Sequence, residues 1–210
     1  MAASAYRALA SLLIPPRCAA CAAPTRPTAT LCPGCRRELE AATPGAGPVS
    51  GVGGVVWAAP YEGVARELVA ALKFAGRLAL AEVAAERIVA SLPADLGAVG
   101  VVAVPPEPLR LRRRGFDPAD LIAGAIAKRL DVPLEPVLRR RRGQRQVGRR
   151  RSERLASPPR VSAAACPRHP ALLVDDVLTT GATLRACARA LRGAGCREIR
   201  AAVFARALGD

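Results

Sequence analysis

Aromatic side chains make up only 3% of this 210-residue sequence, and there is a single histidine and no long hydrophobic run. The apolar stretch from Tyr6 to Ile14 ends at Pro15-Pro16 and is shorter than the roughly 18–20 residues that cross a bilayer. Residues 1–5 carry no charged side chain and Arg7 interrupts the apolar run, which is unlike a secretory signal. We therefore expect no transmembrane segment, a short amphipathic N-terminal helix and a cytoplasmic location.

Acidic residues are also few: 17 Asp and Glu stand against 32 Lys and Arg, and the formal net charge is +15. Only two of the cations are lysines, but genomic base composition produces such an arginine bias as readily as phosphate recognition does. The charge favours nucleic acid, phosphorylated metabolites or an anionic membrane as partners, and a plain arginine-rich protein is the alternative. The 51% hydrophobic content excludes global disorder, and the length allows one domain plus a small appendage.

Four of the seven cysteines form two C-x2-C pairs separated by ten residues. This spacing is typical of a zinc ribbon, in which four thiolates complete a tetrahedral shell around a structural zinc ion. Disulfides and an iron or redox site are the alternatives, and both are disfavoured by the repeated pair and the missing secretory signal. The predicted ligands are Cys18, Cys21, Cys32 and Cys35. The other cysteines lack such spacing and are expected to be small buried side chains: Cys166, Cys187 and Cys196.

A stretch rich in Pro, Gly and Ala, from Ala41 to Pro48, is interpreted as a linker. It divides the chain into a zinc module over residues 1–43 and a main domain over residues 50–210. Apolar runs in the main domain predict strands at Val52–Pro60, Val99–Val104, Ala171–Val174 and Glu198–Phe204, with a further start at Pro136–Leu138. Helical spacing predicts helices at Val64–Phe74, Leu78–Leu92, Pro118–Leu130 and Leu184–Gly195. Their alternation indicates an α/β fold with a mostly parallel, Rossmann-like sheet.

The most informative segment follows the strand at residue 171, where Asp175 and Asp176 precede a loop of threonines and glycine that opens a helix. In α/β sheets ligands bind at this end of the strands. The two carboxylates can accept hydrogen bonds from ribose hydroxyls or hold a divalent ion, and the loop with its helix N-terminus suits a phosphate. A ribose 5-phosphate site is therefore predicted, and an ordinary capped turn is the alternative. The predicted phosphate ligands are Thr179, Thr180, Gly181, Ala182 and Thr183.

This segment resembles the 5-phosphoribosyl 1-diphosphate (PRPP) motif of type I phosphoribosyltransferases. The whole chain resembles the ComF family, in which a Cys₄ zinc module precedes a phosphoribosyltransferase-like domain. The shared features are Lys73 to Arg77, Val104-Pro105 followed by Arg112 to Phe116, and Gln146 with Arg154. The chain departs from the family pattern at Asp117-Pro118, where members usually have Asn-Gln, and at Arg149 and Ser157, where they usually have Leu and Asn.

The resemblance implies that the protein binds PRPP with Mg²⁺ and transfers its phosphoribosyl group, with loss of pyrophosphate, in the setting of DNA uptake. Asp175 and Asp176 would bind the ribose or Mg²⁺. The implied pyrophosphate ligands are Pro105, Arg112, Arg113, Arg114 and Gly115. No acceptor pocket or general base is identifiable, and His169 is expected in a loop. A non-catalytic protein that handles single-stranded DNA and uses PRPP or a nucleotide only as a ligand is the alternative, and a PRPP-responsive regulator is a weaker one.

Nine arginines and one acid, Glu153, lie between residues 139 and 154. By resemblance this stretch corresponds to the family's mobile loop, with Arg139, Arg140, Arg141, Arg142, Gln146 and Arg154 as its candidate site residues. Three interpretations stay open: a lid on pyrophosphate, a nucleic-acid patch, and a solvated loop. Because the run contains no aromatic residue, contacts with DNA there would be to the backbone and independent of sequence.

Overall fold

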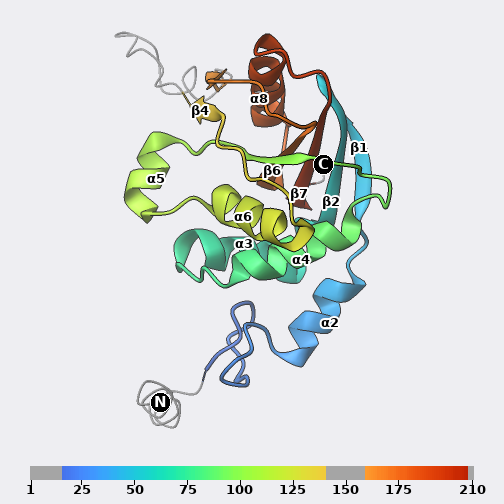
Figure 1. Cartoon of the computed structure of the whole chain (residues 1–210). Helices are drawn as coiled ribbons and strands as arrows, with labels where there is room; N and C mark the ends of the chain where they lie inside the picture. Colours follow the sequence, from blue (N-terminus) through green and yellow to red (C-terminus); the bar gives the residue numbers. More distant parts are fainter. Residues whose placement is uncertain (1–15, 141–158, 208–210) are drawn as a thin grey trace.

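A five-stranded sheet with helices on both faces forms the centre of the molecule in a computed structural model that describes residues 16–140 and 159–207 (Figure 1). The strand order is β1-β2-β7-β6-β3, and all neighbouring pairs except β1 with β2 are parallel. The strands are β1 (Gly45–Val49), β2 (Val52–Pro60), β3 (Gly100–Ala103), β6 (Ala171–Leu178) and β7 (Ile199–Arg206). The helices are α2 (Pro33–Ala41), α3 (Gly63–Phe74), α4 (Leu80–Ser91), α5 (Pro108–Arg114), α6 (Pro118–Leu130) and α8 (Ala182–Gly193).

The period-two pattern of the central strands divides the core into two clusters. On β6, Leu172 and Val174 pack against α3, α4 and α6, whereas Leu173 packs against α8 on the opposite face. Both faces of the strand are buried, which explains why it reads as a continuous apolar run. The predicted α/β fold with a mostly parallel sheet is therefore confirmed.

The linker prediction was wrong for residues 45–48, which belong to edge strand β1 and pair antiparallel with β2. The glycines that suggested a linker have a packing role here. A Cβ atom on Gly45 would lie 2.5 Å from the Trp57 ring of β2, and one on Gly47 would lie 3.3 Å from it. The strand therefore needs glycine because the indole ring lies against its backbone.

Strand β6 extends four residues beyond its expected end at Val174, so Asp175 and Asp176 lie inside the strand, not after it. They pair along β7, but β3 ends at Ala103, opposite Val174. Pro105 and Pro106 follow directly, and proline cannot donate to a ladder. The early end of β3 leaves one edge of β6 open beside the two carboxylates.

Residues 108–114, for which the sequence pattern predicts no helix or strand, form helix α5, which has no buried residue and projects from the side of the molecule (Figure 1). Gly115 ends it with a φ of +77°, a left-handed conformation that favours glycine. A separate two-stranded antiparallel sheet joins β4 (Leu138–Arg140) to β5 (Val161–Ala163).

The cysteine module packs directly on the main domain. Cys18, Leu31, Cys35 and Leu39 belong to the same core cluster as the apolar side chains of α3. The division of the chain into residues 1–43 and 50–210 stays a prediction, and the expected N-terminal helix lies outside the described residues. Within residues 16–140 and 159–207, no helix combines the length and apolar character that a membrane crossing requires.

Candidate functional site

Lys73 of α3 reaches the predicted ribose site. Its Nζ donates to Oδ1 of Asp176 at 2.7 Å, and the two side chains are only 19% and 12% exposed. Oδ1 of Asp175 in turn accepts a hydrogen bond from the backbone N–H of Asp176 at 2.8 Å. The open edge of β6 therefore carries two consecutive carboxyl groups whose side chains alternate across the sheet, with the ammonium of Lys73 on the side of Asp176.

A third carboxyl group faces this pair. Asp117 caps α6 by accepting from the N–H of Ala119 at 3.3 Å. Burial and the negative charges of Asp120 and Asp176 raise the pKa of Asp117 to about 6. Burial and the charge of Asp176 raise the pKa of Asp175 to about 8. The site thus has an excess of carboxyl groups over cations, which suits a ligand that offers hydroxyl groups or a cation.

The threonine loop leads from β6 into α8. Gly181 is the N-cap residue, with a φ of +72°, and has no side chain to cap the helix. Thr180 Oγ1 accepts from the N–H of Ala182 at 3.4 Å, and its carbonyl accepts from Arg185 Nη1 at 2.8 Å. Thr179 and Thr180 are exposed. The first-turn N–H groups of α8 and these hydroxyls can therefore donate to an anion.

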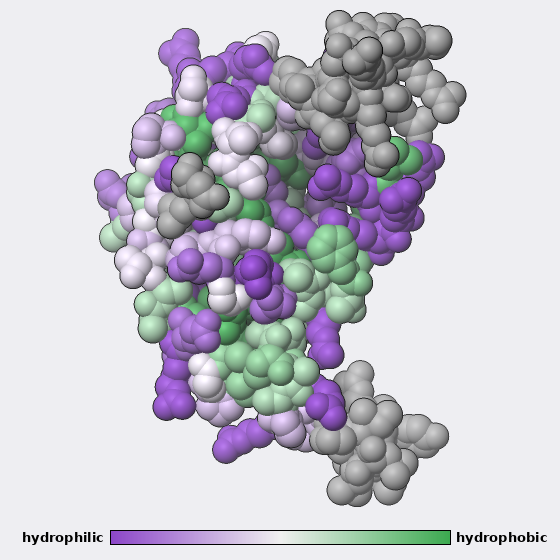
Figure 2. Space-filling view, turned by 180° about the vertical axis from the view of Figure 1, so that it is seen from behind, coloured by the Kyte–Doolittle hydropathy of each residue, from purple (hydrophilic) through white to green (hydrophobic). Residues whose placement is uncertain are grey.

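The candidate pyrophosphate ligands lie on and around α5. Pro105 is buried, Arg112 and Arg113 are exposed, and the guanidinium of Arg114 lies over the Phe74 ring, 5.2 Å from its centroid. Figure 2 shows hydrophilic surface gathered where α5 lies, with hydrophobic surface directly beside it. The structure thus brings α5 next to Phe74, the last residue of α3. The residue before it, Lys73, contacts Asp176.

Only part of the basic run can be placed. Arg139 is exposed and Arg140 half-buried in β4. The other candidates, Arg141, Arg142, Gln146 and Arg154, lie outside the described residues.

The cysteine cluster has the geometry of a tetrahedral metal site. The sulfur atoms of Cys18, Cys21, Cys32 and Cys35 all lie within 4.8 Å of one another. The Sγ atoms of Cys21 and Cys32 are 3.7 Å apart, which matches the spacing of about 3.8 Å expected for Zn–S bonds near 2.3 Å. Burial opposes ionisation of Cys18, but backbone N–H groups of Cys21, Cys32 and Ala20 lower its pKa to about 6. The donor set fits a structural zinc ion.

Magnesium has less support from the side chains. Among the described residues, the four cysteines are the one group of three or more potential metal ligands that converge. Asp175 and Asp176 offer a carboxylate pair at most, so Mg²⁺ would depend on oxygens of the ligand itself.

Two residues of this site were not assigned a role from the sequence. The family resemblance includes Lys73 only within the shared Lys-Phe-Ala-Gly-Arg segment, and Asp117 marks a departure from the family pattern. The rarity of lysine in the chain was a usable signal for Lys73. His169 is exposed in a bend, as expected, whereas Cys166 is exposed and its predicted burial was wrong.

Comparison with known proteins agrees with this architecture. Residues 119–210 match the family model of the phosphoribosyl transferase domain, and residues 9–52 match the double zinc ribbon domain. The chain is 35% identical over 114 residues to Competence protein F of Haemophilus influenzae, covering 51% of this chain and 50% of that protein. It thus spans about half the length of this curated relative. These matches confirm the resemblance to the ComF family, with a zinc ribbon followed by a phosphoribosyl transferase domain.

Proposed function

We propose that this protein binds PRPP and Mg²⁺ and transfers the phosphoribosyl group to an acceptor with release of pyrophosphate. One observation supports this most: the buried Lys73–Asp176 pair beside Asp175, at the strand end that leads into a glycine-capped helix. Carboxylates for a diol near the end of β6, and N–H groups for a phosphate at the start of α8, match the two ends of a ribose 5-phosphate.

In this proposal Asp175 and Asp176 accept hydrogen bonds from the ribose hydroxyls, and residues 179–183 donate to the 5-phosphate. Lys73 keeps Asp176 oriented and offsets part of the negative charge. Arg112, Arg113 and Arg114, with the backbone at Pro105 and Gly115, attract the pyrophosphate. Bound Mg²⁺ would neutralise charge on the departing pyrophosphate.

The distinguishing experiment is a pyrophosphate-release assay with PRPP and Mg²⁺ across a panel of nucleobases and related nitrogen nucleophiles. The proposal predicts release with at least one acceptor and loss of that activity in an Asp175→Asn/Asp176→Asn double variant. PRPP binding without release by any acceptor would instead favour a binding protein.

A second candidate function is a non-catalytic protein that handles single-stranded DNA, with PRPP or a nucleotide as a ligand only. The observation that favours it is Phe74, whose side chain is 79% exposed beside Arg114 and the arginines of α5. An exposed ring beside a guanidinium group offers a surface on which a base can stack, and the run from residue 139 to 154 contains no such ring. The Haemophilus relative is named a competence protein. For this second candidate function, the corresponding cellular role would be a part in DNA uptake.

A cytoplasmic location belongs to the same proposal. The reduced thiolates that a Cys₄ zinc site needs persist in that compartment.

A further inference from the structure

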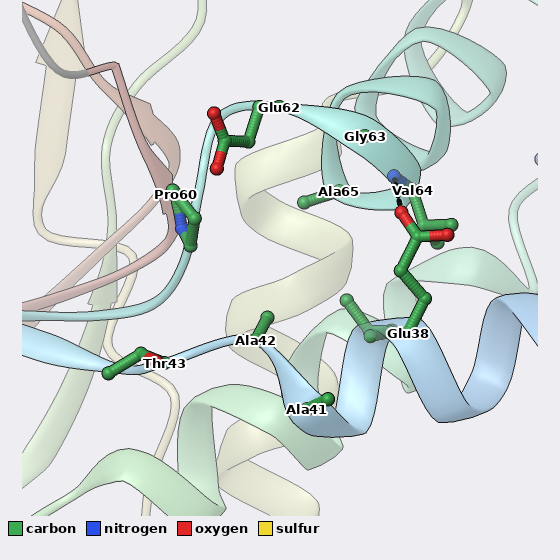
Figure 3. A pocket seen from close by; sticks show the side chains of 10 residues that line it. Glu38, Ala41, Ala42, Thr43, Pro60, Glu62, Gly63, Val64 and Ala65 are labelled. Atoms are coloured by element: carbon green, nitrogen blue, oxygen red, sulfur yellow. Dashed lines mark hydrogen bonds between the residues drawn. The ribbon is translucent and has the colours of Figure 1, made fainter.

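Helix α3 receives its N-terminal cap from the zinc ribbon. Oε1 of Glu38, on α2, accepts a hydrogen bond from the N–H of Val64 at 3.0 Å, drawn as a dashed line in Figure 3. The N-cap residue of α3, Glu62, makes no side-chain hydrogen bond of this kind. A carboxylate near a helix N-terminus also interacts favourably with the helix dipole. Glu38 therefore takes the capping role from 26 residues away.

The zinc ribbon also contacts the chain just past the other end of α3. Arg77 Nη1 donates to the carbonyl of Arg17 at 3.3 Å. Arg17 directly precedes Cys18, and Glu38 lies three residues after Cys35. The zinc ribbon thus makes one hydrogen bond to the start of α3 and one to the segment just after α3. In each of them the residue of the ribbon lies within three positions of a predicted zinc ligand.

Apolar packing and a hydrogen bond act together at the joint between α2 and α3. A pocket of about 350 Å³, open to solvent on one side, lies at this joint and is lined by residues of α2, the segment after it and the turn into α3 (Figure 3). Leu39 and Val64 contribute to its wall, although both also belong to the shared core. The hydrogen bond from Val64 to Glu38 joins two residues that line this pocket, so it adds a directional contact to the apolar packing of α3.

Lys73 lies in the last turn of α3, so the orientation of this helix decides whether Lys73 meets Asp176. The segment from Val64 to Lys73 spans about 14 Å at 1.5 Å per residue. A tilt of about 10° at the N-terminus would move the start of the Lys73 side chain by about 2 Å. That displacement is comparable with the 2.7 Å length of the Lys73–Asp176 contact.

We propose that Glu38 is a positioning residue through which the zinc ribbon holds Lys73 against Asp176. The consequence for PRPP binding rests on the function proposed above. The effect of Glu38 on the contact between Lys73 and Asp176 does not depend on that function. The zinc ribbon is then part of the machinery that shapes the ribose site.

The test uses the two lysines of the chain, Lys73 and Lys128, as internal reporters. The full-length, zinc-loaded protein is labelled with an amine-reactive reagent, and the modification rate at each lysine is measured by mass spectrometry. Lys128 is exposed and serves as the reference. Glu38→Ala removes the cap, whereas Glu38→Gln keeps an amide oxygen that can accept from Val64. Glu40→Ala is the matched control, since Glu40 lies on the exposed face of α2, where it pairs with Arg36 at 3.9 Å.

We expect Lys73 to react at least three times faster in Glu38→Ala than in the native protein. Lys128 should not change, and Glu38→Gln and Glu40→Ala should stay near native. If Glu38→Ala fails to fold, Arg77→Ala loosens the other contact and should raise Lys73 labelling in the same direction. Unchanged Lys73 labelling in the folded variants would overturn the proposal.

PRPP titration of the same variants separates this inference from the proposed function. Weakening of PRPP binding by about tenfold in Glu38→Ala, with zinc content still one per chain, supports both. If the native protein does not bind PRPP, the proposed function fails while the labelling still decides the role of Glu38.

Discussion

The ammonium of Lys73 and the carboxylate of Asp176 are in contact at 2.7 Å although 103 residues separate them in the chain. The pair joins the end of α3 to the open edge of β6, and both partners are largely buried. Breaking a buried pair by removing one partner leaves an uncompensated charge. The pair is therefore both a structural link and a component of the proposed ribose site.

Replacing Lys73 by methionine should lower the free energy of unfolding by about 1–3 kcal/mol, because the Asp176 carboxylate loses its partner in a poorly hydrated site. The same variant should bind PRPP at least tenfold more weakly. Urea unfolding and calorimetric titration measure the two effects. Lys128→Met, on the exposed side of α6, is the matched control and should change neither value by a comparable amount.

Gly181→Ala should disrupt the phosphate loop. A side chain at a φ of +72° is strained, and the new Cβ would lie 3.2 Å from Val49 and 3.3 Å from Arg185. We expect a loss of about 1–2 kcal/mol in stability and a larger proportional loss of phosphate affinity. Gly193→Ala, whose Cβ would meet no atom within 4 Å, should be neutral or slightly stabilising. Equal affinity for PRPP in the two variants would argue against a phosphate site at residue 181.

The raised pKa of Asp117 predicts a pH dependence of stability. Its carboxyl group holds a proton up to a pKa of about 6 in the folded protein, against 3.8 ordinarily. Below pH 3.8 both states are protonated, and between pH 3.8 and 6 the unfolded chain releases the proton first. The free energy of unfolding should therefore fall across this window and stay lowered above it, by about 3 kcal/mol from this residue.

Asp117→Asn should flatten that decline, because asparagine caps a helix about as well as aspartate but does not titrate. Urea unfolding at pH 4, 5, 6 and 7 is the measurement. Parallel curves for the variant and the native protein would contradict the assignment. Asp131→Asn provides a control at an exposed C-cap position.

Zinc content should depend on the cysteine cluster alone. We expect one zinc ion per chain in the native protein and less than half of that in Cys21→Ser, together with lower stability because metal binding contributes folding energy. Elemental analysis with thermal unfolding checks both. Cys166→Ser removes an exposed cysteine outside the cluster and should keep the full zinc content. Native protein with well under one zinc per chain would refute the Cys₄ site.

The DNA-handling candidate predicts a specific effect of Phe74. Phe74→Ala should weaken binding of single-stranded DNA by about 1–3 kcal/mol, the usual contribution of one stacked base. Leu134→Ala, which removes another exposed apolar side chain, should have little effect. Fluorescence anisotropy at low and moderate salt measures the affinity for single-stranded DNA, which should fall steeply as the salt concentration rises. A flat salt response would eliminate this candidate.

Elements with a regular apolar pattern were predictable. The expected bounds of β2 and α6 agree with the structure, since burial on one or both faces imposes their periodicity. Helix α5 was missed because none of its residues is buried, so it carries no such pattern. Strand β1 was missed because its glycines suggested a linker. The strand needs glycine for the close contact with the Trp57 ring, and that tertiary contact is not visible in the local sequence.

The same distinction applies to the site. Asp175 and the threonine loop are adjacent in sequence and could be grouped from it. The positions of Lys73, Asp117 and Glu38 depend on how α3, α6 and α2 pack, and no local pattern encodes those contacts. The clustering of the four cysteines could be predicted, because the C-x2-C spacing that marks metal ligands is a local feature of the sequence.

The most direct test of the central claim is calorimetric titration of the full chain with PRPP in the presence of Mg²⁺, repeated with the Asp175→Asn/Asp176→Asn variant. The account predicts one PRPP bound per native chain and a loss of binding of at least a hundredfold in a variant that unfolds cooperatively like the native protein. Absence of binding by the native protein, or equal binding by the variant, would contradict it.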